Sequence, residues 1–384
     1  MDINAKLICE TIENNKSTQL NLLEELCNID SGSGNIKGNK ELVEIIKKQL
    51  QLIGAEIEEI YNPYYGTHIL ARINKGIFSE KLILAAHLDT VFKEGDAKKH
   101  PFRVDGEFAY GLGVADCKGG VVTILTALKT LVKANLMPKK EIVIIFNCDE
   151  EVGSPSSKEL FKKEATNAMA VLSFEPGRKR NGILTSRYGL AEGKIVVSGK
   201  SAHACLDNGP GVNAIVELAN VIINLNKQDD DSNGIHYNVS PISGGRGPSV
   251  VADKAEGEFW VTFKSFAAYE QIKKYILEDL PNQKANSESE IITELNLLFP
   301  PMERSEQNIL LHKQISDIAA KLNIELPEEM SKSPADCNFY ADFGTPTVDG
   351  LGPYMFNIHT VEEHIIVSSL YERTKLAANL IREL

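Results

Sequence analysis

The stretch KLILAAHLDT, residues 81–90, decides the fold class of this chain. Five consecutive apolar residues end at His87, and Asp89 follows two positions later. A short uninterrupted apolar run is typical of a strand that is buried on both faces of a parallel sheet. Further strand-like runs lie at residues 68–73, 141–147 and 168–174. Because residues 120–132 between them have the apolar spacing of a helix, the sequence predicts an α/β fold with a mixed, largely parallel sheet flanked by helices.

A second pattern begins near residue 189 and ends near residue 299. Its strand-like and helix-like runs follow in the order 193–197, 212–225, 256–263, 269–277 and 291–298. A chain of 384 residues is long enough for two compact units. The sequence therefore predicts one discontinuous domain, residues 1–188 and 300–384, interrupted by an inserted α+β domain, residues 189–299.

The composition argues against several classes of partner. The chain has 41 Lys and Arg against 53 Asp and Glu, a formal net charge of -12. Nucleic acid and anionic membrane surfaces both favour clustered basic residues, so neither is an expected partner. The first residues have no basic leader followed by an apolar run, and no stretch approaches the roughly 20 apolar residues that span a bilayer, which predicts a cytoplasmic protein. Six scattered cysteines without a CxxC pair indicate neither a disulfide framework nor a thiolate zinc site.

Acids and histidines stand where the predicted strands end, which is the edge at which α/β sheets bind ligands. His87 ends one strand, and Asp116 lies in the glycine-rich GLGVADCKGG, residues 111–120. Asp89 is placed to accept a hydrogen bond from the second ring nitrogen of a metal-bound His87. Each residue alone has an ordinary alternative, which is a structural histidine for His87 and a helix cap for Asp116.

Three further segments add residues of the same kind. CDEEVGS, residues 148–154, ends a strand with three successive acids, Glu175 follows another strand, and His359 ends a glycine-rich loop. Three adjacent like charges are unfavourable unless solvent or a cation compensates them, so a solvated loop and a cation site both remain open. Together, two histidines and three carboxylates suit zinc, and also cobalt or manganese. Glu150 lies beside the candidate ligand Glu151, is not itself needed as a ligand, and is therefore available to transfer a proton.

The ordered strings HLDT, GLGVADCKGG, CDEEVGS, FEPG, SGKSAHA and the final GLGP with His359 resemble a known family. It is the dizinc exopeptidase and deacylase family of glutamate carboxypeptidase, aminoacylase, acetylornithine deacetylase and succinyl-diaminopimelate desuccinylase. The resemblance runs over nearly the whole chain. It implies that residues 1–188 and 300–384 form the catalytic domain. It further implies that residues 189–299 form a lid and dimerisation domain, and that the chain is a homodimer.

The resemblance also implies a role for each candidate residue. Two zinc ions would be held by His87 and Glu175, by Glu151 and His359, and by Asp116 as the bridge between them. Asp89 would orient His87, and Glu150 would be the general base toward the water that the metals share. His203, within SGKSAHA, would reach the active site of the partner subunit and stabilise the tetrahedral oxyanion. The family commonly has a cis peptide bond after the bridging aspartate.

The substrate-binding region departs from the family pattern. The differing positions are Ser249, Thr262, Met355 and Phe356. The family pattern has an asparagine at the position of Ser249 and an arginine at that of Thr262, and both bind a substrate carboxylate. It has glycines at the positions of Met355 and Phe356. Arg187 and Lys264 are the candidate substitutes for the missing cation, with an ordinary exposed basic residue as the alternative.

Hydrolysis of the amide bond in a small peptide is the leading function, as a carboxypeptidase or dipeptidase. One alternative is a deacylase of N-acyl amino acids, which uses the same metals and base with a different pocket. Another is a binding protein that keeps the fold without turnover. The presence of Glu150 beside a full set of ligands argues against this last alternative.

Overall fold

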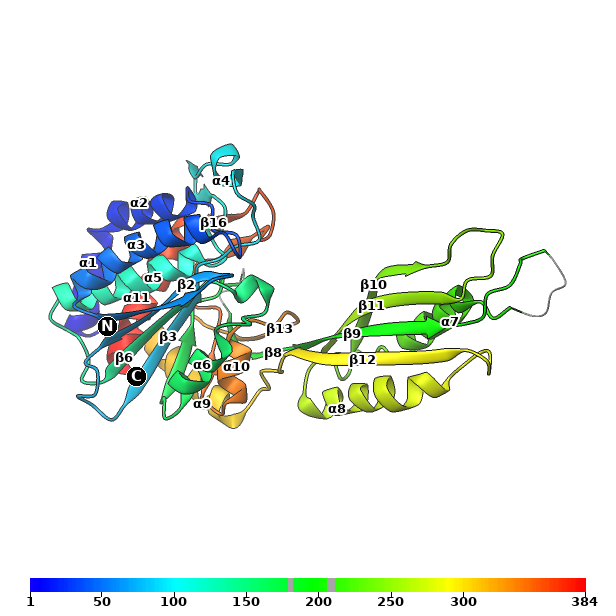
Figure 1. Ribbon diagram of the computed structural model, residues 1–384. Coiled ribbons are helices and arrows are strands. Elements are labelled where there is room, and N and C mark those ends of the chain that lie inside the picture. The colour runs from blue at the N-terminus through cyan, green and yellow to red at the C-terminus, as the bar shows by residue number, and fades with distance from the viewer. Residues whose placement is uncertain (179–181, 206–210) are drawn as a thin grey trace. The chain divides into compact units, whose positions relative to one another are not determined.

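The computed structural model (Figure 1) describes residues 1–178, 182–205 and 211–384. They form two compact units. Unit 1 comprises Met1–Ser186, Arg304–Met330 and Ala335–Leu384, and unit 2 comprises Arg187–Glu303 and Ser331–Pro334. The sequence pattern did not separate residues 331–334 from the first domain. They join unit 2 because the guanidinium of Arg187 donates to the carbonyls of Ser333 and Pro334, at 2.9 and 3.3 Å.

Unit 1 contains most of the helices that the structure describes. They are α1 (Ile3–Glu13), α2 (Lys16–Cys27), α3 (Ile36–Ile53), α4 (Asp96–Lys99), α5 (Lys118–Lys133), α6 (Lys158–Ala165), α9 (Glu306–Ala320), α10 (Cys337–Asp342) and α11 (Val367–Glu383). Figure 1 shows α1, α2, α3 and α5 on one side of the central sheet and α6 and α10 on the other. Among the described helices, none combines the length and the apolar character that crossing a bilayer requires.

A six-stranded sheet in the order β1-β2-β6-β3-β7-β14 forms the centre of unit 1. Its strands are β1 (Glu56–Asn62), β2 (Gly66–Ile73), β3 (Lys81–His87), β6 (Glu141–Asn147), β7 (Ala170–Ser173) and β14 (Thr347–Val348). The four strands β6, β3, β7 and β14 are parallel, and β2 runs antiparallel to both of its neighbours, β1 and β6. The predicted fold class, a mixed and largely parallel sheet flanked by helices, is confirmed.

The apolar runs of the sequence become the buried centre of this sheet. Every residue of β6 is buried, and β3 is buried from its second residue to its last. On α5, Val121, Ile124 and Leu128 are fully buried, and this helix packs on β3. Burial of this apolar surface is the main free-energy gain of folding. It fixes the parallel strands so that their carboxyl ends meet at one edge.

A small sheet in the order β15-β16-β5-β4 lies elsewhere in unit 1. Its strands are β4 (Arg103–Asp105), β5 (Phe108–Tyr110), β15 (Met355–Phe356) and β16 (His364–Ile366). The loop between β15 and β16 carries His359. The strands β8 (Ile183–Arg187) and β13 (Glu328–Ser331) form a separate pair.

In the part of unit 2 that the structure describes, a four-stranded antiparallel sheet packs with the α-helices α7 and α8. Its elements are β9 (Gly189–Ser198), α7 (Ala214–Asn226), β10 (His236–Gly244), β11 (Lys254–Phe263), α8 (Phe266–Lys274) and β12 (Glu290–Phe299), with the sheet order β10-β11-β9-β12. Along β11 buried and more exposed residues alternate, as in a sheet that is covered on one face. The buried side, including Phe259 and Val261, joins Leu218 and Val221 of α7 in one core.

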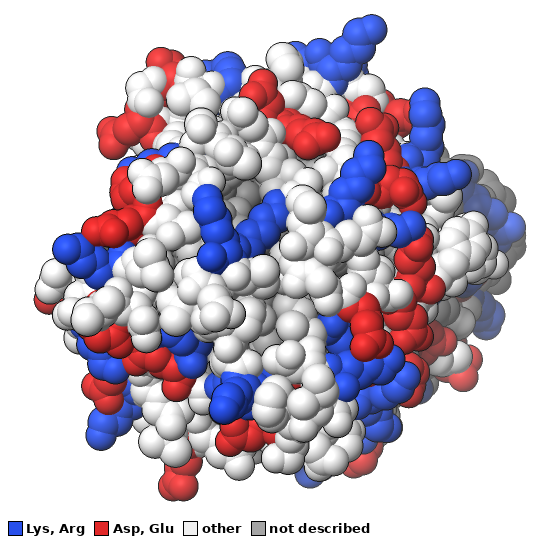
Figure 2. Space-filling model, turned by 90° about the vertical axis from the view of Figure 1, so that its left-hand side faces the viewer, with Lys and Arg blue, Asp and Glu red and all other residues white. Residues whose placement is uncertain are grey.

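Charged side chains of both signs are exposed. On the face that Figure 2 shows, Lys and Arg are interspersed with Asp and Glu. The negative net charge of -12 is therefore accompanied by local mixing of charges on this face.

Candidate metal centre

Two groups of side chains in unit 1 have the composition of metal sites. One contains His87, Asp116, Cys117 and Glu175, and the other contains Asp116, Glu151 and His359. Within each group the possible ligand atoms lie within 4.8 Å of one another. Asp116 belongs to both groups, so one carboxylate joins them.

The two oxygens of Asp116 face two different histidines. Its Oδ1 lies 3.0 Å from Nε2 of His87, and its Oδ2 lies 3.3 Å from Nε2 of His359. Each histidine also has a second acid nearby, with Glu175 Oε1 at 3.6 Å from His87 Nε2 and Glu151 Oε2 at 3.5 Å from His359 Nε2. The fold therefore brings together all five residues that the resemblance implies as metal ligands. Their ligand atoms are two imidazole nitrogens and carboxylate oxygens, the donor set that zinc accepts.

The backbone around Asp116 explains its position. The helix α5 begins at Lys118, and its N-cap is Cys117 without a side-chain capping bond, so Asp116 is not a helix cap. The Asp116–Cys117 peptide bond is cis, as the resemblance implied. Cys117 donates its thiol proton to the carbonyl of Phe174 at 3.1 Å, and burial raises the pKa of this thiol well above its usual range. The thiol proton of Cys117 is thus engaged by a backbone carbonyl, and the other members of the two groups offer nitrogen and oxygen atoms.

Asp89 organises both His87 and the acidic turn. The Nδ1 of His87 lies 3.0 Å from the Asp89 carbonyl oxygen and 3.4 Å from its Oδ1, so the ring presents Nε2 to the acids. The Asp89 carboxylate also accepts from the backbone N–H groups of Glu150 and Glu151, both at 3.1 Å, and from the Ser33 hydroxyl at 2.6 Å. One buried carboxylate thus fixes the turn that carries two of the candidate residues.

The three successive acids after β6 have different environments. Asp149 is fully buried, and its carboxylate accepts from the backbone N–H and hydroxyl of Ser156, both at 2.7 Å. Glu150 is half-buried, and burial together with the nearby Glu175 raises its pKa well above the usual range, although His87 opposes the shift. Burial and the neighbouring Asp116 raise the pKa of Glu151 to about 8. Asp149 is therefore a structural acid, whereas the charged forms of Glu150 and Glu151 are disfavoured where they stand and would be stabilised by a cation.

The neighbouring acids also raise the pKa values of the two histidines. Burial disfavours the charged form of His87, but Glu175 and Asp116 raise its pKa well above the usual range. The hydrogen bond to Asp116 raises the pKa of His359 to about 9. The acids thus stabilise positive charge at this place, which is the electrostatic condition for a cation site.

Glu363 is a residue of this centre that the sequence did not single out. It is 1% exposed, and its carboxylate accepts from the backbone N–H groups of Gly113, Ala115 and Asp116 at 3.1, 2.8 and 3.0 Å. It fixes the loop that presents Asp116. Its position in the string HTVEE after His359 was the available signal, but its partners lie some 250 residues earlier in the chain.

Aromatic packing anchors the hairpin of His359. The ring of Phe356 stacks on His364 with centroids 4.9 Å apart and an interplanar angle of 6°, and meets the ring of Phe108 edge-on at 6.2 Å. His359 itself has a positive φ of 62° and an exposed side chain. Phe356 therefore holds the hairpin by stacking.

The remaining candidate residues belong to unit 2. His203 is exposed, and its Nδ1 accepts from the backbone N–H of Cys205 at 3.1 Å. Arg187 is buried and donates to the Ser333 and Pro334 carbonyls. Lys264 donates to the carbonyls of Asp231 and Ser232 at 3.2 and 3.0 Å, and Thr262 donates to the Gly234 carbonyl at 3.3 Å. Each of these side chains thus has a hydrogen bond within its own unit.

This chain is similar to known proteins over most of its length. The model of peptidase family M20/M25/M40 matches residues 83–383. Carboxypeptidase G2 of Pseudomonas sp. strain RS-16 is 30% identical over 373 residues, covering 94% of this chain and 88% of that protein. The N-formyl-4-amino-5-aminomethyl-2-methylpyrimidine deformylase of Halalkalibacterium halodurans is 24% identical over 414 residues, covering 97% and 95%. The solved structure of aminopeptidase PepT from Bacillus cereus superposes with a TM-score of 0.82 at 22% identity, covering 96% and 98%.

Proposed function

Because this chain belongs to peptidase family M20/M25/M40 and is a metal-dependent hydrolase, we propose that it cleaves the amide bond of small peptides at a two-metal centre. The activity would be that of a carboxypeptidase or dipeptidase. The similarity to carboxypeptidase G2 over most of both chains supports this substrate class.

The observation that carries the proposal is the double contact of Asp116 with His87 and His359, at 3.0 and 3.3 Å. One carboxylate that faces two histidines is suited to bridge two ions. In the proposed arrangement His87 and Glu175 hold one zinc and Glu151 and His359 the other. Cobalt and manganese accept the same ligands.

When bound, two divalent ions would supply Lewis acidity toward a substrate carbonyl and would lower the pKa of a water molecule in the site. The chain's own contribution is proton transfer. Glu150 accepts the proton of the water at its carboxylate and donates it to the leaving nitrogen. Its backbone N–H is bound by Asp89 at 3.1 Å, which orients it, and its raised pKa suits a group that alternates between base and acid.

Two neighbouring substitutions test this division of roles. Glu150→Gln should keep two metals per chain and lose about 10²- to 10⁴-fold in turnover, because a neutral amide cannot accept the proton. Glu151→Gln should instead lose metal. Elemental analysis and dipeptide hydrolysis of both variants are the measurements. Near-normal turnover of Glu150→Gln, or one metal or fewer in the unaltered protein after metal loading, would reject the proposal.

His203 is the proposed oxyanion donor, acting across a homodimer. Its Nδ1 accepts a backbone N–H, so a neutral ring carries its proton on Nε2. That tautomer offers the donor that a developing oxyanion needs. Unit 2 is the proposed lid and dimerisation domain, and the exposed apolar side chains Ile215, Val216 and Ile223 of α7 support pairing through it.

Removal of an acyl group from an N-acyl amino acid is the second candidate function. The similarity to a deformylase over 97% of this chain favours it, because that protein also cleaves an amide. Arg187 and Lys264 remain the proposed contacts to a substrate carboxylate. We place the enzyme in the cytoplasm, which the six free cysteines support.

A further inference from the structure

A buried carboxylate, Asp336, binds both ends of the acidic turn that follows β6. The residue is 6% exposed, and its Oδ2 accepts a hydrogen bond from Nδ2 of Asn147 at 2.7 Å. Its Oδ1 accepts a hydrogen bond from the hydroxyl of Ser154. Asn147 is the last residue of β6, and Ser154 lies shortly after the 3₁₀ turn Glu150–Val152. One side chain therefore spans the whole segment from the end of the strand to the end of the turn.

Ser154 has a backbone conformation that other contacts must hold in place. Its φ is 54°, in the left-handed region that residues other than glycine rarely adopt. It is fully buried, and its backbone N–H donates to the carbonyl of Asp149 at 2.8 Å, which closes the acidic turn. The buried hydroxyl needs an acceptor of its own, and Asp336 supplies it. Without that carboxylate, the turn would end on a strained residue whose hydroxyl has lost this acceptor.

Asn147 is held between two carboxylates at the other end of the turn. Its Nδ2 donates to Asp336 at 2.7 Å and to Oδ1 of Asp149 at 3.3 Å, and the residue is buried. Because both contacts need an N–H group, the orientation of this amide is fixed. The end of β6 is therefore tied to Asp336 through a buried side chain that has one orientation.

The oxygens of Asp336, rather than its charge, are what this position requires. Burial raises the pKa of Asp336 to about 7, although the Ser154 hydrogen bond opposes the shift. The charged form is thus disfavoured there. An asparagine would offer one oxygen to Asn147, and its amide could donate to Ser154, whose hydroxyl can also accept. Asp336→Asn therefore preserves both contacts, whereas Asp336→Ala removes both.

We propose that Asp336 is a positioning residue, which fixes the acidic turn and so sets where the carboxylates of Glu150 and Glu151 stand. Asp336 belongs to neither group of possible metal ligands, so it acts through the turn. Asp89 binds backbone N–H groups inside the turn, and Asp336 binds its two ends. A displacement of about 1 Å at a reacting group can lower a rate by about 10²-fold. The effect on catalysis rests on the proposed function, whereas the effect on the metal centre rests on its ligands alone.

Two substitutions of Asp336 test the proposal on metal-loaded protein. Asp336→Ala should lower kcat for a dipeptide by about tenfold or more, because the base is displaced. Its KM should stay within about twofold of the unaltered value, because the proposed substrate contacts lie in unit 2. Asp336→Asn should restore kcat to within about threefold of the unaltered protein. Ser154→Ala, which loses one of the two contacts, should also lower kcat, and combining it with Asp336→Ala should have little further effect.

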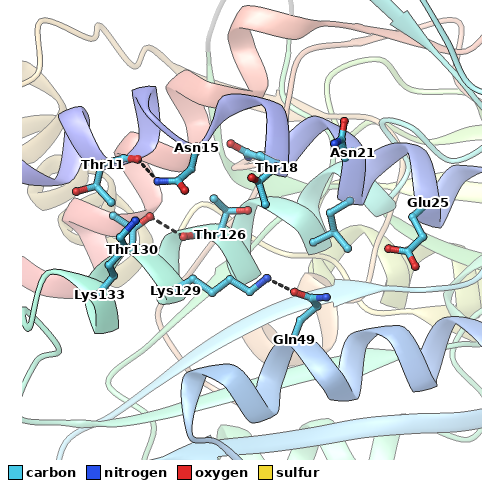
Figure 3. A pocket seen from close by; sticks show the side chains of 12 residues that line it. Thr11, Asn15, Thr18, Asn21, Glu25, Gln49, Thr126, Lys129, Thr130 and Lys133 are labelled. Carbon is cyan, nitrogen blue, oxygen red and sulfur yellow. Dashed lines mark hydrogen bonds between the residues drawn. The ribbon is translucent and has the colours of Figure 1, made fainter.

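Two control substitutions remove comparable groups without touching the acidic turn. Asp342→Ala removes an exposed acid from α10, the helix that Asp336 precedes. Gln49→Ala removes the acceptor of a partly buried hydrogen bond that Lys129 donates between α5 and α3, as Figure 3 shows. Both variants should keep the kcat of the unaltered protein, so a general effect of losing a charge or a hydrogen bond would be recognised.

The visible absorption spectrum of cobalt-loaded protein reports the geometry of the metal centre without any substrate. Because Glu151 is a proposed ligand, Asp336→Ala should shift the cobalt bands, whereas Asp336→Asn and the two controls should keep them. If the unaltered protein cleaves no peptide, this shift still supports the proposal, and only the proposed function fails. An unchanged cobalt spectrum in folded Asp336→Ala would overturn the proposal, as would an equal loss of kcat in Asp336→Asn and Asp336→Ala. If Asp336→Ala does not fold, Ser154→Ala takes its place in the spectral comparison.

Discussion

Asp89 and Glu151 are joined by a hydrogen bond of 3.1 Å, in which the backbone N–H of Glu151 donates to the Asp89 carboxylate. The same carboxylate binds the N–H of Glu150, so the base and one candidate ligand depend on a single acid behind them. His87 contacts the same residue through Nδ1.

Asp89→Asn should weaken metal binding about 10- to 100-fold, the usual effect of removing a partner that orients a metal ligand. The neutral amide keeps the shape of the side chain but loses the charge that holds two backbone N–H groups. Competition with a chelator measures the affinity. Asp105→Asn, in an exposed strand, is the control. Unchanged metal affinity in Asp89→Asn would show that the acidic turn keeps its position without this charge.

Glu363→Ala should lower the melting temperature and the metal content together. Three buried N–H groups would lose their acceptor, at about 1–3 kcal/mol for each group that finds no other partner. We expect a fall of roughly 5 °C or more by calorimetry. Glu362→Ala alters the adjacent residue, whose side chain is 65% exposed, and should have little effect. Equal effects of the two substitutions would exclude a special role for Glu363.

His68 should make the protein sensitive to acid. Its side chain is buried beside Ser156, and burial lowers its pKa below the ordinary value of 6.5. Below about pH 6.5 the His68 side chain is therefore protonated in the unfolded chain but stays neutral in the folded chain. The free energy of unfolding is unaffected by this histidine above that pH, and it decreases as the pH falls. Compared with the unaltered protein, His68→Asn should be less destabilised at pH 5.5 than at pH 7.5. Melting temperatures at both values measure this, and a pH-independent difference would contradict it.

His203→Ala should lower turnover without changing the metal content. If this histidine acts across a dimer, mixing the variant with Glu150→Gln should partly restore activity, because one hybrid site then has both an intact base and an intact donor. The measurement is turnover after subunit exchange. Lack of restoration despite demonstrated exchange would exclude action across the dimer.

Substrate preference should favour small or apolar dipeptides over glutamyl conjugates. Thr262 occupies the position where the family pattern has an arginine, and a hydroxyl cannot make the two parallel charge-assisted bonds of a guanidinium to a carboxylate. Comparison of kcat/KM for Ala- and Leu-containing dipeptides with that for glutamyl conjugates tests this. A clear preference for glutamyl conjugates would refute the argument about the pocket and leave the metal chemistry intact.

Local patterns predicted the elements that are buried, but not those at the edges. The strand Glu141–Asn147 was predicted with its observed bounds because its apolar run is continuous. By contrast, β1 (Glu56–Asn62) is an exposed edge strand rich in acids, and β10 (His236–Gly244) is mostly polar. Neither has the apolar signal of a buried strand, so both were missed. Their pairing depends on neighbours in the sheet rather than on their own composition.

The candidate site shows the same limit. His87, Asp116 and Glu175 were identified because each follows a recognisable strand or glycine-rich string. The role of Glu363 depends on backbone N–H groups of a distant loop, and no local pattern encodes that contact. Arg187 is likewise buried and binds carbonyls in its own unit, whereas the sequence left a contact to a substrate carboxylate and an ordinary exposed position as the two alternatives.

The interruption of unit 1 by unit 2 also orders events during protein synthesis. His87, Asp116 and Glu175 are translated first, then all of Arg187–Glu303, and His359 only afterwards. At about 5–20 residues per second, the ribosome needs roughly 10–40 s between Glu175 and His359. During that interval the nascent chain has every candidate ligand except His359, so only the site of His87 and Glu175 has its full set. We therefore expect ribosome-bound chains arrested before residue 359 to hold at most one metal ion, and metal analysis of such arrested chains would reveal this order of loading.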